Sequence, residues 1–332
     1  MVPLSVLDLS PVPATGTPSQ AIRDSVAVAV ACDTLGFSRF WVAEHHNLPN
    51  VASSAPEVLI AHIAAVTSHM RVGAGGIMLP NHNPLRVVEI FRTLAALHPG
   101  RIDLGLGRAP GTDPVTASAL QRDDIKDPNV RLAEVLAFDR GSFEPTHPFH
   151  GVAAMPTDVT LPEIWMLGSS LAGGDIAAAE SLRYAFAGHF AMRHATAALA
   201  WYRNHFRPSD ALPRPYAMLG VTVVCGEDDA HAQELLAPLK LAVVRIRTGR
   251  RAPIPTLTEA REYRYSAQED AIADEFLRGA IIGGPERVRE GLERLARESA
   301  VDELMLASLI PGRDERIRHY ARIATLAGLT RR

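Results

Sequence analysis

The sequence is poor in cysteine, in net charge and in long apolar runs. Its 332 residues include two cysteines, Cys32 and Cys225, which are far apart and lack the spacing of a metal site. The net charge is −3, and no basic face suited to nucleic acid or an anionic membrane is evident. The longest apolar run, Val26 to Cys32, is too short to span a bilayer, and no signal peptide precedes it. We expect a cytoplasmic protein with no metal, nucleic-acid or membrane partner.

Strand and helix signals alternate along the whole chain. Helices are expected to begin at Thr17-Pro18 and Asn83-Pro84, where a capping side chain precedes a proline. The predicted strands cover residues 4–9, 37–43, 70–79, 101–107, 163–168, 184–187, 216–224 and 301–309. Eight such alternations without a break in composition predict an α/β protein, a (β/α)8 TIM barrel with insertions that forms one domain over residues 1–332. A doubly wound open sheet is the alternative.

Residues 250–279 interrupt this alternation. They show no clean hydrophobic period, so we expect an irregular excursion from the barrel. A lid over the site and a surface loop both fit this pattern, and the sequence does not separate them.

Polar side chains follow the ends of the predicted strands. In a parallel barrel these ends meet at one rim, where active sites are built. The rim residues are Asp8, Glu44-His45-His46, Asn81-His82-Asn83, Gly107-Arg108, Ser169-Ser170 and His189. No His-x-His or His-Glu-x-x-His spacing occurs, and adjacent residues of a strand face opposite sides, so we expect no metal. The chain also lacks a Gly-x-Ser-x-Gly turn and a Gly-x-Gly-x-x-Gly fingerprint, because Pro110 replaces the third glycine.

Two other features of the rim are compatible with a phosphate and a flat ring. Ser169 and Ser170 precede a predicted helix, whose free N–H groups favour an anion, and Arg108 offers a guanidinium to the same group. Alternatively, Ser170 only caps the helix and Arg108 pairs with an acid. Gly75-Gly76 in mid-strand indicates either a close approach by a ligand ring or a bulge.

Several motifs together resemble the bacterial luciferase-like flavin monooxygenases. They are residues 41–46 (WVAEHH), 72–86 (VGAGGIMLPNHNPLR), 100–108 (GRIDLGLGR), 165–170 (WMLGSS) and 283–286 (GGPE). The resemblance implies a TIM barrel that binds reduced FMN (FMNH2) at its C-terminal rim, with His45 as general base. It also implies a non-proline cis peptide at Gly75-Gly76. The FMN phosphate would be held by Arg108, with Pro110 in the following loop, and by Ser170 with Ser169 beside it.

The chain departs from luciferase itself at two positions. Gly107 stands where luciferase has a reactive cysteine, and His189 stands where it has a tryptophan. Both departures argue against the aldehyde-specific, light-emitting chemistry.

The sequence therefore predicts an FMN-dependent, two-component monooxygenase. A separate flavin reductase would supply FMNH2, and O2 would oxygenate a small organic substrate. We expect His45 to be oriented by Glu44, and His82, His189 and Asp8 to line the substrate pocket. Family members are usually dimers, so a homodimer is expected. The alternatives are a coenzyme F420-dependent hydride-transfer oxidoreductase with the same barrel and a non-catalytic FMN-binding flavoprotein.

Overall fold

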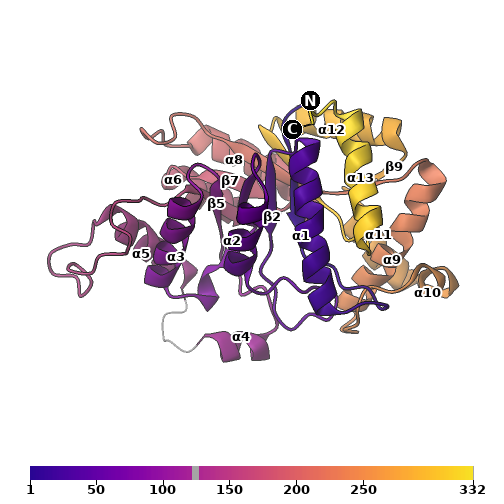
Figure 1. Ribbon diagram of the computed structural model, residues 1–332, viewed down its shortest axis with the longest axis horizontal. Coiled ribbons are helices and arrows are strands. Elements are labelled where there is room, and N and C mark those ends of the chain that lie inside the picture. The colour runs from indigo at the N-terminus through magenta and orange to yellow at the C-terminus, as the bar shows by residue number, and fades with distance from the viewer. Residues whose placement is uncertain (122–126, 332) are drawn as a thin grey trace.

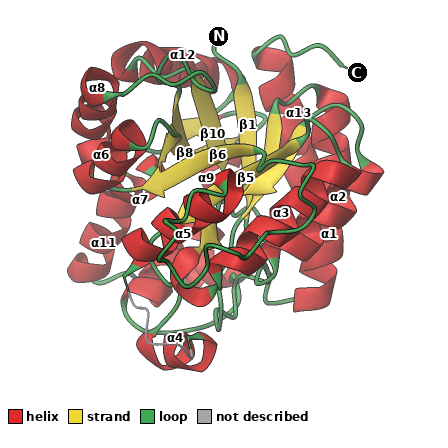
Figure 2. Ribbon diagram, turned by 90° about the vertical axis from the view of Figure 1, so that its left-hand side faces the viewer, coloured by secondary structure: helices red, strands yellow, loops and turns green. Residues whose placement is uncertain are grey.

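The chain folds into a closed barrel of parallel strands surrounded by helices (Figures 1 and 2). The computed structural model describes residues 1–121 and 127–331; residues 122–126 and 332 of the predicted domain lie outside the described residues. The barrel strands are β1 (Leu4–Asp8), β2 (Arg39–Val42), β3 (Arg71–Ala74) with its continuation β4 (Ile77–Met78), β5 (Ile102–Gly107), β6 (Glu163–Gly168), β7 (Arg183–Phe186), β8 (Ala217–Cys225) and β10 (Glu303–Ala307). Their order along the sheet follows their order in the sequence.

The last strand closes the barrel. β10 pairs in parallel with β1, where Leu4 lies opposite Leu304, and with β8, where Met218 lies opposite Glu303. An open doubly wound sheet would leave the first strand without this partner. The TIM-barrel prediction is confirmed, and the open-sheet alternative is wrong.

The predicted strand over residues 70–79 is interrupted in the middle. β3 ends at Ala74, β4 begins at Ile77, and a 3-10 turn, η1 (Leu79–Asn81), follows. The peptide bond between Gly75 and Gly76 is cis, as the family resemblance implies. A Cβ on Gly76 would lie 2.1 Å from a methyl carbon of Leu167, so only glycine fits there without a shift.

Helices connect the strands of the barrel. They are α1 (Pro18–Leu35), α2 (Pro56–Val66), α3 (Pro84–Leu97), α4 (Pro114–Leu120), α5 (Pro128–Arg140), α6 (Leu171–Ala179), α7 (Gly188–Ala191), η2 (Met192–His194), α8 (Ala195–His205), α9 (Asp229–Arg247), α12 (Pro285–Ser299) and α13 (Arg313–Leu326). The Thr17 and Asn83 side chains each accept a backbone N–H of the helix that follows. Within the described residues, no helix is long and apolar enough to cross a membrane.

Residues 250–279 are more regular than expected. They contain α10 (Leu257–Glu262) and α11 (Ala267–Leu277), and β9 (Ile281–Gly283) follows and pairs with the end of β8. The prediction of an irregular excursion is therefore wrong for these helices. The hydrophobic period does not reveal them because both are short and mostly exposed to solvent: Ala273 is the one buried residue of α11. Their capping side chains, Thr256 and Ser266, are the signals that the hydrophobic period does not show.

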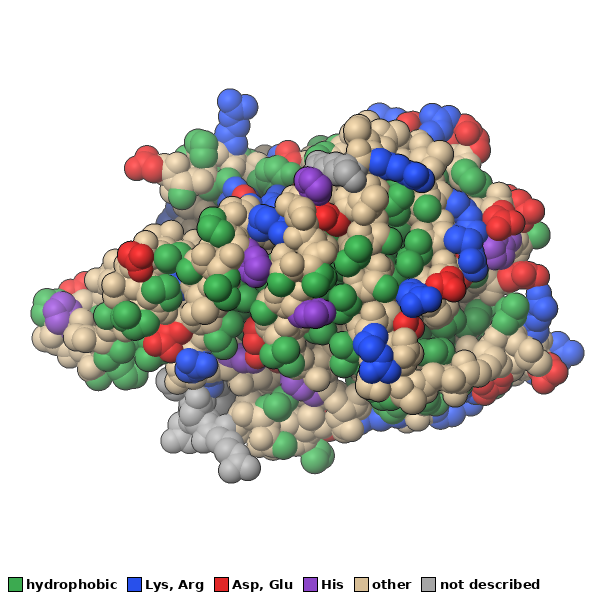
Figure 3. Space-filling view, in the orientation of Figure 1, with side chains coloured by type: hydrophobic (Ala, Val, Ile, Leu, Met, Phe, Trp, Pro, Cys, Tyr) green, Lys and Arg blue, Asp and Glu red, His purple; other side chains and the backbone are tan. Residues whose placement is uncertain are grey.

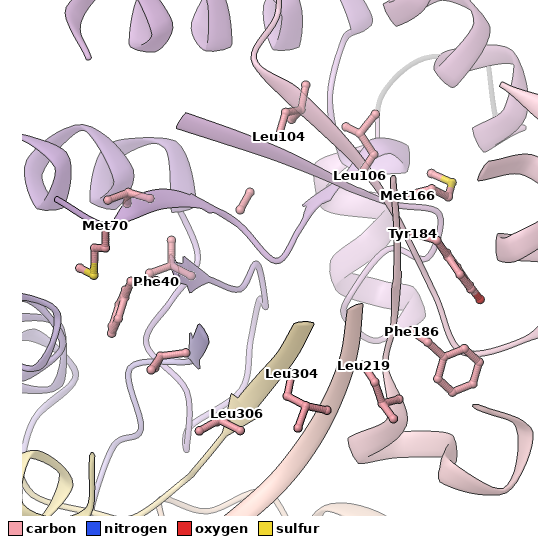
Figure 4. Packing of buried hydrophobic residues seen from close by; sticks show 14 of the residues in the cluster. Phe40, Met70, Leu104, Leu106, Met166, Tyr184, Phe186, Leu219, Leu304 and Leu306 are labelled. Atoms are coloured by element: carbon pink, nitrogen blue, oxygen red, sulfur yellow. The ribbon is translucent and has the colours of Figure 1, made fainter. Parts of the chain in front are cut away.

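Two layers of apolar side chains hold the barrel together. Outward-facing strand residues such as Phe40, Leu104 and Leu304 pack between strands and helices (Figure 4). Inside the barrel, Trp41 and Trp165 meet edge to face with centroids 5.2 Å apart. Buried ion pairs fill the N-terminal end of the barrel; they involve Arg39, Asp103, Glu163 and Glu303. The opposite end, on the side of α4 and α10 in Figure 1, carries the C-terminal rim.

Candidate active site

A buried carboxylate, Glu44, organises the loops at the rim. It follows β2 and is fully buried. Its Oε1 accepts hydrogen bonds from His46 Nε2 (2.9 Å) and Asn81 Nδ2 (2.8 Å). Its Oε2 accepts from the Met78 backbone N–H (2.8 Å) and lies 2.9 Å from His82 Nε2. Such a set of donors is what a buried carboxylate needs to remain charged.

Glu44 and His82 stabilise each other in their charged forms. Burial would raise the pKa of Glu44, but hydrogen bonds, first of all from His82, lower it overall. Burial would likewise lower the pKa of His82, but the hydrogen bond and charge of Glu44 raise it. Each group thus favours the charged form of the other, and the His82 side chain is 24% exposed.

Replacing Glu44 with alanine is expected to destabilise the protein by about 3 kcal/mol, because the four donors around this buried carboxylate lose their acceptor. Glu44→Gln, which keeps one acceptor oxygen, should cost less. Urea unfolding measures both changes. The control is Glu89→Ala, which removes an exposed i,i+3 partner of Arg86 and should cost under about 1 kcal/mol. A Glu44→Ala protein as stable as this control would contradict the role of Glu44 as the acceptor that holds the rim loops together.

His45 does not contact the Glu44 carboxylate, contrary to the expected orientation. Its Nδ1 lies 3.0 Å from the carbonyl oxygen of Gly111, in the loop after β5, so Nδ1 carries the proton and Nε2 is left as an acceptor. Burial lowers the pKa of His45, against smaller opposing effects of Gly111 and Glu44. His45 is thus a neutral imidazole whose Nε2 can take a proton, as a general base requires.

His189 lies close to His45 at the same rim. It is the second residue of α7, which follows β7, and its Nδ1 is buried without a hydrogen-bond partner. A Cβ on Gly220 of β8 would lie 2.8 Å from this nitrogen. Burial, with a smaller effect of His45, lowers the pKa of His189 to about 4. Two neutral imidazoles therefore share this part of the rim.

Arg108, Ser169 and Ser170 form a group with free donors. The pairing of β5 with β6 places the residues after Gly107 beside the end of β6, and the Tyr184 hydroxyl donates to the Ser170 carbonyl oxygen (3.0 Å). Arg108 forms no ion pair within the described residues, and its Nε is buried without a partner. Both serines are exposed, and the Ser170 side chain makes no capping hydrogen bond. Neither simple alternative, a pure cap or a pairing with an acid, is observed.

Glycines let the start of α6 approach the end of β6. A Cβ on Gly168 would lie 3.2 Å from the Cα of Gly173, and a Cβ on Gly173 would lie 3.1 Å from the Cα of Gly168. The exposed N-terminus of α6 therefore lies directly over the strand end, where its free N–H groups face the rim.

Asp8 does not join this group. Although it ends β1, its Oδ1 accepts from Ser25 and the Ser10 backbone, and its Oδ2 lies 2.7 Å from the Arg316 guanidinium in a fully buried ion pair. Both oxygens are thus occupied in linking β1 to α1 and α13. The structure does not place Asp8 in a substrate pocket.

The segment between α9 and α10 reaches the rim. Arg251 donates to the Asp113 carboxylate (3.2 Å) and to the Asn47 carbonyl oxygen (3.3 Å). Ile254 pairs through its backbone with the loop after β1, at Pro13. The first part of the excursion is therefore attached to three rim loops. The sequence offered no sign of these partners, nor of Gly111 as the acceptor for His45.

Comparison with known proteins identifies the family. The family model described as luciferase-like monooxygenase matches residues 2–303. A luciferase-like monooxygenase of Escherichia coli K12 is 36% identical over 96% of this chain and 95% of its own length, and YvbT of Bacillus subtilis 168 is 42% identical over 97% and 95%. The solved structure of apo-MsnO8 has a TM-score of 0.87 and 35% identity, with both chains fully covered. The chain belongs to the luciferase-like monooxygenase family and is an oxidoreductase. The alternative of a non-catalytic flavoprotein is therefore wrong.

The names of some less similar proteins mention a substrate or a cofactor. N-acetyl-S-alkylcysteine monooxygenase of Bacillus subtilis 168 is 30% identical over 96% of each chain. Two solved structures share the fold at low identity. They are the oxygenating constituent of 3,6-diketocamphane monooxygenase of Pseudomonas putida in complex with FMN (TM-score 0.69, 16% identity, 97% and 96% covered) and an F420-dependent secondary alcohol dehydrogenase (TM-score 0.67, 13% identity, 98% of each covered).

Proposed function

We propose that the protein is an FMN-dependent, two-component monooxygenase that oxygenates a small organic substrate. The observation that carries this proposal is the unpaired Arg108 guanidinium beside the exposed N-terminus of α6, on the same rim as His45. A fixed cation and free backbone N–H groups together are suited to a phosphate monoester. The imidazole of His45 supplies a base on the same rim.

Unpartnered polar atoms support the fit of such a cofactor. Buried polar atoms normally have hydrogen-bond partners. At this rim Asn81 Oδ1, Arg108 Nε and His189 Nδ1 have none within the described residues. A ligand with a phosphate at one end and a polar heterocycle at the other offers both acceptors and donors to such atoms.

The residues present can bind FMN and move a proton. Arg108, Ser169 and Ser170 would hold the phosphate, and the break at Gly75-Gly76 lies beside the inner wall where a ring can approach. Bound in its reduced form, FMN would supply two electrons to O2, so that one oxygen atom enters the substrate and the other leaves as water. His45 would accept a proton at Nε2 while the Gly111 carbonyl fixes its ring, and the neutral His189 would help to exclude water. His82, held by Glu44, would lie at the substrate side.

Similarity favours FMN over F420 for this chain. The relatives at 30–36% identity that carry an activity in their names are monooxygenases. The F420-dependent dehydrogenase shares only 13% identity, which supports the fold alone. The FMN-binding neighbour, at 16% identity, likewise supports the fold alone, so the separate flavin reductase remains part of the proposal.

Isotope labelling tests the reaction class. The purified protein is mixed with a flavin reductase, NADH, FMN and a panel of thioethers and ketones under ¹⁸O2. We expect one product to gain a single ¹⁸O atom, and only when the reductase is present. Oxidation of a substrate by F420 without incorporation of oxygen would instead establish hydride transfer.

We also propose a homodimer formed through α1 and α2. The outer face of α2 is formed by Val58, His62, Ala65 and Val66, with no charged side chain among them, and Val58 is 64% exposed. Over these two helices, the surface in Figure 3 is mostly hydrophobic or neutral. A helix that is apolar on its outer face is usually covered. A second copy suits this face, because a two-fold contact would bring the uncharged outer residues of α2 against their own copies.

Replacing Val58 with glutamate should dissociate the dimer, since it places two like charges in the contact. Light scattering coupled to size exclusion should show the mass of two chains for the wild type and of one chain for Val58→Glu. The control is Val152→Glu, at an exposed valine far from α2 in the sequence, which should remain a dimer. A wild type that is monomeric at all concentrations would refute this contact.

A further inference from the structure

We propose that Asn81 is a positioning residue: by bridging Glu44 and Pro110, it fixes where His45 and Arg108 lie relative to each other. The inference rests on the proposed function and assigns to Asn81 a role in FMN binding and proton transfer. Asn81 is the last residue of η1, so it comes from a different rim loop than His45 or Arg108.

The two N–H bonds of one amide connect two other loops. Asn81 Nδ2 donates to Glu44 Oε1 at 2.8 Å, in the loop after β2, and to the Pro110 carbonyl oxygen at 3.0 Å, in the loop after β5. The bond to a buried carboxylate is charge-assisted and therefore strong. Three rim loops thus meet at a single side chain.

Pro110 lies between the two groups that the reaction would use. Arg108 is two residues before it, and Gly111, whose carbonyl holds His45 Nδ1, comes directly after it. Within the part of the chain that the structure describes, residues 108–111 accept side-chain hydrogen bonds only from Asn81 and His45. Loss of the Asn81 bond would remove the hydrogen bond at Pro110, while Thr112 and Asp113 keep their own partners further along the loop. We therefore expect Arg108 and the Gly111 acceptor for His45 to shift together.

Only a donor satisfies both partners of Asn81. The Glu44 carboxylate and the Pro110 carbonyl are acceptors, so an aspartate at position 81 would have the right size but would face both with oxygen atoms. An alanine would leave the two acceptors without this donor but would add no repulsion. A donor role therefore predicts that Asn81→Asp is more damaging than Asn81→Ala, whereas a space-filling role predicts the reverse order.

The test compares Asn81→Ala, Asn81→Asp and a matched control, Asn83→Ala. The Asn83 side chain lies at the exposed surface, where it caps α3, and it makes no hydrogen bond to Glu44 or to residues 108–111. FMN affinity is measured by quenching of flavin fluorescence, and the tautomer of His45 by ¹⁵N NMR of the cofactor-free protein. We expect about tenfold weaker FMN binding for Asn81→Ala, a larger loss for Asn81→Asp, and wild-type affinity for Asn83→Ala. Turnover of Asn81→Ala should fall about 100-fold, as for a misplacement of about 1 Å.

The NMR signal separates positioning from mere loss of stability. The wild type should show His45 with its proton on Nδ1, and both Asn81 variants should show a mixture of tautomers. Asn83→Ala should keep the wild-type spectrum even if it unfolds at a lower temperature. An unchanged His45 spectrum in the Asn81 variants, or an Asn81→Asp protein equal to the wild type, would overturn the proposal. Absence of FMN binding by the wild type would instead refute the proposed function, while the NMR comparison still tests the link.

Discussion

Arg108→Ala is expected to bind FMN about 10–100-fold more weakly than the wild type. Hydrogen bonds to a charged group contribute about 1.5–3 kcal/mol, and each 1.4 kcal/mol corresponds to a factor of ten in affinity. The guanidinium has no competing partner within the described residues, so its full interaction is available to a phosphate. Equilibrium titration of flavin fluorescence measures the loss.

Two comparisons show whether the phosphate is the group recognised. Riboflavin, which lacks the phosphate, should bind the wild type and Arg108→Ala equally. Arg108→Lys should lie between the two proteins in FMN affinity, because it keeps the charge but not the planar fork. Arg86→Ala, at an exposed arginine of α3, is the control. Equal FMN affinity of Arg108→Ala and the wild type would contradict the phosphate site.

His45→Ala should lower the rate of oxygen transfer by about 10²–10⁴-fold while FMN affinity stays nearly unchanged. Positioned general bases contribute rate factors of this size. In this structure His45 has one nitrogen fixed by Gly111 and the other available to a proton. Single-turnover assays with preloaded FMNH2 separate the two effects. The control is His205→Ala, at an exposed end of α8. A large loss of FMN affinity with unchanged turnover per bound flavin would refute the role of base.

The pH dependence of the rate should report the same group. Burial lowers the pKa of His45 below its ordinary value of 6.5, so the free base predominates at neutral pH. The rate should therefore be constant near neutrality and should fall as the pH drops through this lowered pKa. Among its neighbours, burial lowers the pKa of His189 to about 4, the pKa of Glu44 lies below its ordinary value, and that of His82 lies above it. In His45→Ala the acidic fall of the rate should disappear.

The barrel and its rim were predictable because they depend on local patterns. Strands β5 and β6, the caps at Thr17 and Asn83, and the polar residues after each strand follow from periodicity and residue chemistry. Periodicity also shows that His45 and His46 diverge, as they do toward Gly111 and Glu44.

The partners of buried charges were not predictable. Asp8 was expected in the pocket, but Arg316, on the last helix, neutralises it once β10 closes the barrel. Glu44 was expected to orient its neighbour His45, but it binds Met78, at the end of β4, and His82, in the loop before α3, instead. Such pairings depend on how separate loops meet in space, and a single sequence does not contain that information. The short helices in residues 250–279 were missed although their caps are present, because an apolar stripe is nearly absent.

Anaerobic titration of the protein with FMNH2 and, in parallel, with reduced F420, followed by addition of air-saturated buffer, tests the central claim most directly. We predict tighter binding of FMNH2, and oxygen uptake by the complex after mixing with air. Preferential binding of reduced F420 with no consumption of oxygen would contradict the claim and identify hydride transfer as the reaction.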